Sequence, residues 1–183
     1  MVRIVVLFIL GCNLGTIWAS TKYAHVIESM GPCTGPDYAD VEVPLTNVKL
    51  TKLNRTAKTI SFDFDFPVPI DDNIYVSIKI EKLNGASKEV TFIPQINNPC
   101  PFFLKMYPKY YILIMSNIGV KQPDKCPIPA GHYSLKNFVF NIADSGYNNF
   151  PMKGKFRIRT IFGERKTKKI ITCVETLSDH YAE

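Results

Sequence analysis

Three histidines are the side chains of this sequence best suited to acid–base chemistry or metal binding, and they lie far apart. His25, His132 and His180 do not form the HxxxH or HExxH spacing that places zinc ligands on one helix face. His132 follows Gly131 at the start of an expected strand, which favours a structural role. The motifs of serine hydrolases, phosphate-binding loops and dinucleotide folds are also absent. The sequence therefore predicts a non-enzymatic protein that needs no metal or cofactor.

Cysteines can act as nucleophiles or bind zinc, but their number and spacing here favour disulfides. The chain has five cysteines, and Cys12 lies in an N-terminal segment that we expect to be removed. The other four are Cys33, Cys100, Cys126 and Cys173, and no two have the CxxC spacing of a zinc site. An even number in an exported chain implies two disulfides, with three possible pairings.

Four aspartates form the densest acidic group of the sequence: Asp63, Asp65, Asp71 and Asp72. Asp63 and Asp65 share one face of an expected strand, where two carboxylates could hold a cation or exchange a proton. The glycine-containing pattern of a calcium loop is missing. A half-buried strand needs a polar outer face, so we interpret these carboxylates as that solvated face.

A basic row occupies one face of another expected strand, because Lys153, Lys155, Arg157 and Arg159 recur at every second residue. Such a row suits the anionic headgroups of a membrane surface, and it equally suits an ordinary soluble outer face. The formal net charge of +6 permits attraction to anionic surfaces without requiring it. Nucleic acid is not an expected partner, since the chain has no recognisable nucleic-acid-binding module.

The N-terminus has the organisation of a secretory signal. Arg3 precedes the short apolar run of residues 4–10, and small residues follow near position 19. We therefore expect a signal peptide over residues 1–19 and a single exported, extracellular domain over residues 20–183. The run is shorter than the roughly 20 apolar residues of a membrane-spanning helix. Asn54 opens an Asn-x-Thr sequon and is a candidate glycosylation site on an exposed loop.

Alternation of apolar and polar residues dominates the rest of the chain. Residues 60–66 place Phe62, Phe64 and Phe66 on one face, which is typical of a half-buried antiparallel strand. The pair Asn84-Gly85 is a strong hairpin-turn signal. Seven or eight short strands predict an all-β antiparallel sandwich or β-cup, with strands expected over residues 41–53, 60–66, 74–81, from 90 onwards, 132–142, 155–159 and 168–175.

One segment, near residues 101–118, breaks this alternation. Phe103, Met106, Tyr110 and Leu113 recur at three- and four-residue spacing, as on one face of a helix. Pro108 should kink or divide that helix. We expect one short helical segment, of one or two pieces, to lie against the sheets.

Aromatic residues give the expected sandwich much bulky apolar surface, and two interpretations of them stay open. A packed core is all that many sandwiches require. Alternatively, the sheets separate and leave a cavity that these side chains line. The set comprises Phe62, Phe64, Phe66, Phe92, Phe102, Phe103, Phe138, Phe140 and Phe156.

Two stretches, Asn98-Pro99-Cys100-Pro101-Phe102-Phe103 and the residues 125–138 that read KCPIPAGHYSLKNF, resemble a known family. They are similar to the CheB family of small secreted insect proteins, which is itself similar to the ganglioside activator protein and the ML lipid-recognition proteins. The resemblance covers roughly residues 60–174. It implies a β-cup that encloses an apolar cavity, a non-catalytic role in presenting lipids to other proteins, and the pairings Cys33–Cys173 and Cys100–Cys126.

On this resemblance we expect a secreted, chemosensory-type carrier of a lipid or pheromone-like long-chain ligand. Tyr110 and Tyr133, which we expect in the wall of the cavity, could hydrogen-bond a polar end of that ligand. The competing hypothesis is a solid-cored, non-catalytic module that binds a receptor or another secreted protein, for instance through residues 107–111. The expected cavity wall consists of Phe62, Phe64, Ile78, Phe92, Phe103, Met106, Tyr110, Leu113, Tyr133, Phe138 and Phe156.

Overall fold

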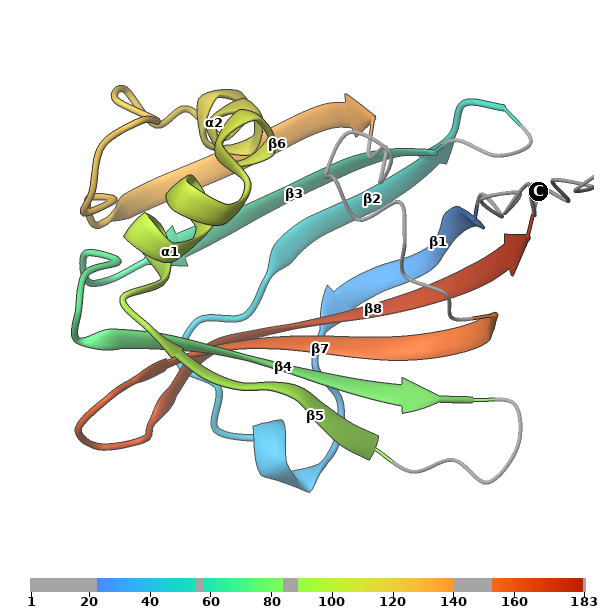
Figure 1. The fold of residues 1–183 in the computed structure, drawn as a ribbon, viewed down its shortest axis with the longest axis horizontal. Helices are drawn as coiled ribbons and strands as arrows, with labels where there is room; N and C mark the ends of the chain where they lie inside the picture. Colours follow the sequence, from blue (N-terminus) through green and yellow to red (C-terminus); the bar gives the residue numbers. More distant parts are fainter. Residues whose placement is uncertain (1–22, 55–57, 84–88, 140–152, 183) are drawn as a thin grey trace, which may run out of the picture.

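Two antiparallel β-sheets face each other in the structure, a computed structural model that describes residues 23–54, 58–83, 89–139 and 153–182 (Figure 1). The larger sheet has the strand order β1-β8-β7-β4-β5, and the smaller has the order β2-β3-β6. The predicted antiparallel sandwich is therefore confirmed. The strands are β1 (Tyr23–Pro32), β2 (Thr46–Lys52), β3 (Lys58–Phe66), β4 (Ile74–Lys82), β5 (Glu89–Asn97), β6 (Gly131–Val139), β7 (Gly154–Glu164) and β8 (Ile170–Ala182).

The predicted helical segment consists of two helices, α1 (Pro99–Met106) and α2 (Pro108–Asn117). Each begins with a proline, which suits the first turn because its missing N–H would have no partner there. The chain changes direction at Tyr107, which ends α1 and precedes Pro108. The helices contact β4 of one sheet and β6 of the other, so they bridge the sheets at one side of the sandwich (Figure 1). No helix within the described ranges is long and apolar enough to cross a bilayer.

The segment before β2 differs from the expected strand over residues 41–53. The strand begins only at Thr46, and the preceding residues cross from one sheet to the other. The backbone N–H of Val43 still donates to Ile171 of β8, at 2.9 Å. Pro44 follows, and its missing N–H cannot extend that pairing. A short 3₁₀ helix, η1 (Pro36–Tyr38), lies just before this crossover, on the outer face of the larger sheet.

Two disulfides join distant segments, and they are the pairs that the resemblance implies. Cys33–Cys173 ties the end of β1 to β8 and packs on the outer face of the larger sheet with Tyr38. Cys100–Cys126 ties α1 to the loop before β6. The expected signal peptide, the Asn84-Gly85 turn and Phe140 lie outside the described residues. Asn54 is exposed just after β2, which leaves its glycosylation a prediction.

Candidate functional site

An apolar cavity of about 320 Å³ lies between the two sheets and the helix pair. Its volume falls at the lower end of the ~300–1,000 Å³ range of small-molecule sites. Among the residues that the structure describes, none of those in the wall is Lys, Arg, Asp, Glu or His. The wall is formed by Leu45, Phe62, Phe64, Phe66, Ile70, Pro99, Cys100, Phe103, Tyr107, Tyr110, Tyr111, Ile114, Met115, Ile118, Ile128, Tyr133, Phe162, Thr172 and Val174.

Strand alternation directs the sheet residues of this wall. Phe62, Phe64 and Phe66 occupy every second position of β3, and Tyr133 is the register partner of Phe64 on β6. The rings of Phe64 and Tyr133 stack with centroids 5.4 Å apart. Phe66 meets Phe162 of the opposite sheet edge-on at 5.6 Å. Aromatic pairs of this geometry contribute about 0.5–1.5 kcal/mol beyond their burial, and the Phe66–Phe162 pair joins the two sheets at this point.

Helix α2 supplies the wall opposite the sheets through one helical face. That face recurs at three- and four-residue steps and comprises Tyr107, Tyr110, Tyr111, Ile114, Met115 and Ile118. The sequence pattern was therefore correct in period but displaced in phase. The expected series placed Met106 and Leu113 inward, whereas they are 52% and 43% exposed. For Leu113 the phase changes because α2 begins at Pro108 and does not continue α1, whereas Met106 is the last residue of α1.

Five of the expected wall residues line the cavity: Phe62, Phe64, Phe103, Tyr110 and Tyr133. The other six do not line it, so their expected placement in the wall is wrong. Phe92 is 46% exposed, because β5 has a bulge at this residue, between the pairs Thr91–Lys79 and Ile93–Ile78.

Ile78, Phe138 and Phe156 point into the sandwich but lie outside the cavity wall. Ile78 is half-buried on β4. Phe138 follows a bulge in β6 and is buried opposite Ile60, beyond the aromatic row of β3. Phe156 is buried against the ring of His180, at 4.9 Å between ring centroids. These residues fill the interior, so packed core and cavity coexist along one sandwich.

Two tyrosine hydroxyls of the wall donate hydrogen bonds to the protein. Tyr111 donates to Cys100 Sγ at 3.1 Å, and Tyr133 donates to the carbonyl of Pro129 at 2.5 Å. Burial raises the pKa of Tyr111 to about 12, and burial also raises the pKa of Tyr133. Both phenols are therefore neutral at physiological pH. The cavity offers apolar contact and neutral hydroxyls, without a charge to pair with an ion.

His132 and His180 lie apart from the cavity. His132 Nδ1 contacts Asp65 Oδ1 at 2.9 Å on the exposed face of the smaller sheet. His180 is buried, and its Nε2 lies 2.8 Å from Ser178 Oγ. Within the described part of the chain, no three His, Cys, Asp or Glu side chains gather as a metal site requires. The Asp63 carboxylate accepts a hydrogen bond from Asn47 Nδ2 at 2.6 Å, as a polar outer face permits.

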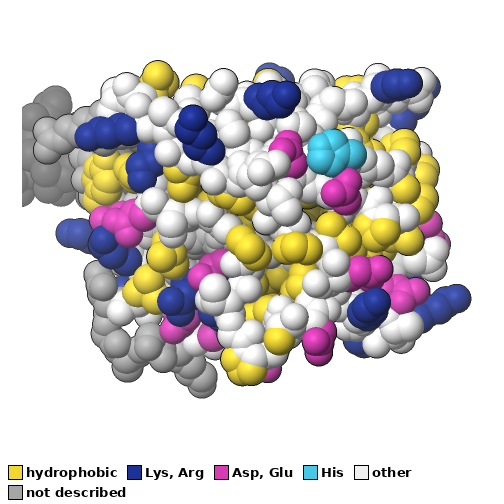
Figure 2. All heavy atoms as spheres, turned by 180° about the vertical axis from the view of Figure 1, so that it is seen from behind, with side chains coloured by type: hydrophobic (Ala, Val, Ile, Leu, Met, Phe, Trp, Pro, Cys, Tyr) yellow, Lys and Arg dark blue, Asp and Glu magenta, His cyan; other side chains and the backbone are white. Residues whose placement is uncertain are grey.

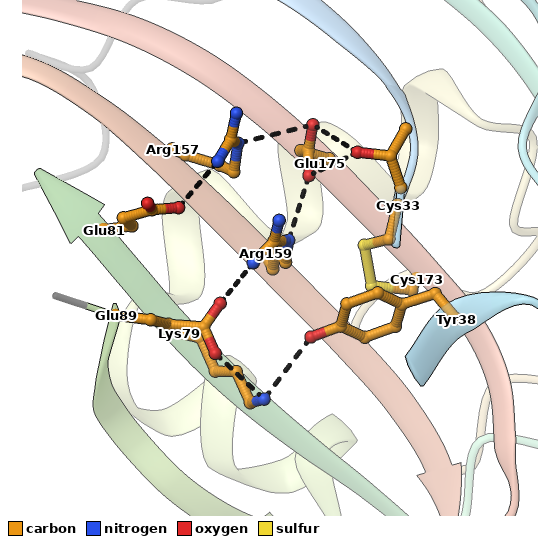
Figure 3. A network of polar contacts seen from close by, with 10 residues as sticks. Cys33, Tyr38, Lys79, Glu81, Glu89, Arg157, Arg159, Cys173 and Glu175 are labelled. Atoms are coloured by element: carbon orange, nitrogen blue, oxygen red, sulfur yellow. Dashed lines mark hydrogen bonds and ion pairs between the residues drawn. A yellow bond between two sulfur atoms is a disulfide. The ribbon is translucent and has the colours of Figure 1, made fainter. Parts of the chain in front are cut away.

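Three residues of the basic row pair with carboxylates on the outer face of the larger sheet, as Figure 3 shows for Arg157 and Arg159. Arg157 bonds Glu81 at 2.7 Å, and Arg159 bonds both Glu89 and Glu175, the latter at 2.9 Å. Lys155 pairs with Glu28 and Lys79 with Glu89. The space-filling view from behind shows charges of both signs around a hydrophobic band (Figure 2). These pairings support the soluble-face interpretation of the row over membrane contact.

Acid should weaken this network. Burial alone would raise the pKa of Glu89, but hydrogen bonds from Lys79 and Arg159 outweigh burial and hold the pKa below its ordinary value of 4.5. The unfolded chain therefore takes up the proton more readily. The stability that Glu89 contributes is present above about pH 4.5. It is lost as the pH falls through the lower folded-state pKa.

We expect the urea midpoint to fall below that pH, and to fall less steeply in Glu89→Gln than in the wild type. An identical pH dependence in the two proteins would show that Glu89 does not contribute.

Comparisons with known proteins do not assign the chain to a family. No protein-family model and no curated protein matches it. Among solved structures, chicken MD-1 complexed with lipid IVa is similar over 87% of this chain and 99% of MD-1, with 8% sequence identity and a TM-score of 0.34. A likeness of this size does not identify the protein, so its function has to be inferred from the cavity itself.

Proposed function

We propose that this protein is a secreted, non-catalytic binding protein that holds a lipid or another long-chain apolar ligand between its sheets and presents it to a partner. The observation that carries the proposal is a 320 Å³ cavity whose wall, as far as the structure describes it, is mainly aromatic and aliphatic and has no charged side chain. Burial of each methylene group there contributes about 0.8 kcal/mol. A chain-like ligand can thus bind tightly without much polar recognition.

The cavity volume limits the size of the ligand. An apolar cavity of roughly 150 Å³ accepts benzene. The 320 Å³ of this cavity therefore accommodate about a dozen carbon atoms by the same measure. This favours one chain, or one segment of a longer chain, over a lipid with several buried acyl chains.

The apolar N-terminal run and two disulfides support an extracellular protein. The alternative, a solid-cored protein-binding module, is disfavoured by the cavity. Its suggested contact segment, residues 107–111, contributes three tyrosines to the cavity wall. Partner contact is better supported at exposed apolar side chains of the helices, namely Phe102, Met106 and Leu113.

Native mass spectrometry of protein secreted from eukaryotic cells tests the proposal. We expect a near-stoichiometric mass increment that organic extraction removes, and the extract identifies the ligand. We also expect the purified protein to bind a fluorescent apolar probe. A protein that carries no increment and binds no such probe would contradict the proposal and support the protein-binding module.

A further inference from the structure

Thr172 is a polar residue in an otherwise apolar part of the cavity wall. It lies on β8 opposite Phe162 of β7, and both residues line the cavity together with Val174. The residue is 4% exposed. Its Oγ1 atom is buried and has no hydrogen-bond partner among the described residues.

A buried hydroxyl without a partner is unfavourable. It costs about 1–3 kcal/mol relative to a paired one, and valine would fill the same shape without that cost. The neighbouring wall residues Phe162 and Val174 are apolar, so their side chains cannot hydrogen-bond the Thr172 hydroxyl. A polar group on a molecule in the cavity would supply what the protein does not, because the threonine hydroxyl both donates and accepts.

The same wall determines which polar group is acceptable. A carboxylate, phosphate or ammonium group would lose its water and find no opposite charge, since the described lining residues carry none. The phenols of Tyr111 and Tyr133 already donate to protein acceptors. The polar group is therefore neutral, and one oxygen is enough to pair with the Thr172 hydroxyl.

We infer that the ligand is a neutral, oxygenated chain of about a dozen carbons, an alcohol, aldehyde, ketone or ester, whose oxygen hydrogen-bonds Thr172 Oγ1. This inference rests on the proposed function and refines it. Thr172 then favours oxygenated chains over hydrocarbons. The uncharged wall disfavours the carboxylate of a fatty acid.

The test uses three probes of equal chain length, dodecanol, dodecane and dodecanoate, each measured by displacement of a fluorescent apolar probe. Thr172→Val keeps the shape of the side chain and removes its hydroxyl. Thr176→Val is the matched control, because Thr176 lies on the same face of β8 but outside the cavity wall. Far-ultraviolet circular dichroism and thermal unfolding establish that both variants are folded.

We expect wild-type protein to bind dodecanol more tightly than dodecanoate. Thr172→Val should bind dodecanol about three- to tenfold more weakly, the worth of one neutral hydrogen bond, and dodecane no more weakly than the wild type. Thr176→Val should change neither affinity. Equal effects of Thr172→Val on dodecanol and dodecane, or tighter binding of dodecanoate, would overturn the inference alone. Failure of every probe to bind the wild type would overturn the proposed function with it.

Discussion

Replacing Ile114 by Trp is expected to weaken ligand binding about fiftyfold, while the same substitution at Leu113 leaves the affinity unchanged. Ile114 lines the cavity, and its neighbour Leu113 is 43% exposed and is not part of the wall. The indole ring would occupy the space of about three chain carbons. At about 0.8 kcal/mol for each methylene, this loss corresponds to roughly a fiftyfold change in affinity.

Tryptophan also reports on its own position. The only Trp of the chain is Trp18, in the segment that we expect to be removed. The introduced indole is then the sole one in the mature protein. We expect blue-shifted emission from Ile114→Trp and emission typical of exposed indole from Leu113→Trp. A folded Ile114→Trp variant with blue-shifted emission and wild-type affinity would show that the ligand binds elsewhere.

A strand of this fold can be predicted from the sequence where apolar and polar residues alternate strictly along it. β3 and β4 place apolar residues at every second position, and their predicted extents match the structure closely. β1 was not predicted, because its apolar residues fall on both faces. This strand is held by its pairing with the C-terminal part of β8. Such pairing joins the two ends of the chain and leaves no local pattern.

The cavity was harder to predict than the fold, for two physical reasons. Which residues of α2 face the cavity depends on where the helix begins. The sequence pattern places Leu113 in the wall, whereas the structure places the next residue, Ile114, there. Phe162, Thr172 and Val174 belong to strands recognised only in part, and whether they meet the cavity depends on how the two sheets pack. A bulge turned Phe92 outward. The residues that alternation fixes without such interruptions, Phe62 and Phe64, were placed correctly.

The two disulfides should differ in what their removal affects. The loop-entropy model predicts that Cys33→Ala/Cys173→Ala lowers the free energy of unfolding by about 5 kcal/mol, since 140 residues separate the cysteines. For Cys100→Ala/Cys126→Ala, with a separation of 26 residues, the model predicts about 3.5 kcal/mol. Urea unfolding of the two double variants measures both values.

Ligand affinity should follow the opposite order. The Cys33–Cys173 bridge packs on the outer face of the larger sheet, away from the cavity. Its loss should leave the affinity of the folded fraction unchanged. Cys100 lines the cavity, and its Sγ accepts the Tyr111 hydroxyl. Loss of its bridge should loosen the helical wall and weaken binding roughly tenfold, by lost preorganisation.

If removal of either disulfide weakened binding equally, the prediction that only Cys100–Cys126 supports the cavity wall would be wrong. The affinity would then depend on overall stability and not on how firmly α1 and α2 are held against the sheets. A selective effect of Cys100–Cys126 would instead locate the ligand at the helical wall. That result is independent of the Ile114→Trp experiment, because it removes a constraint on the wall without filling the cavity.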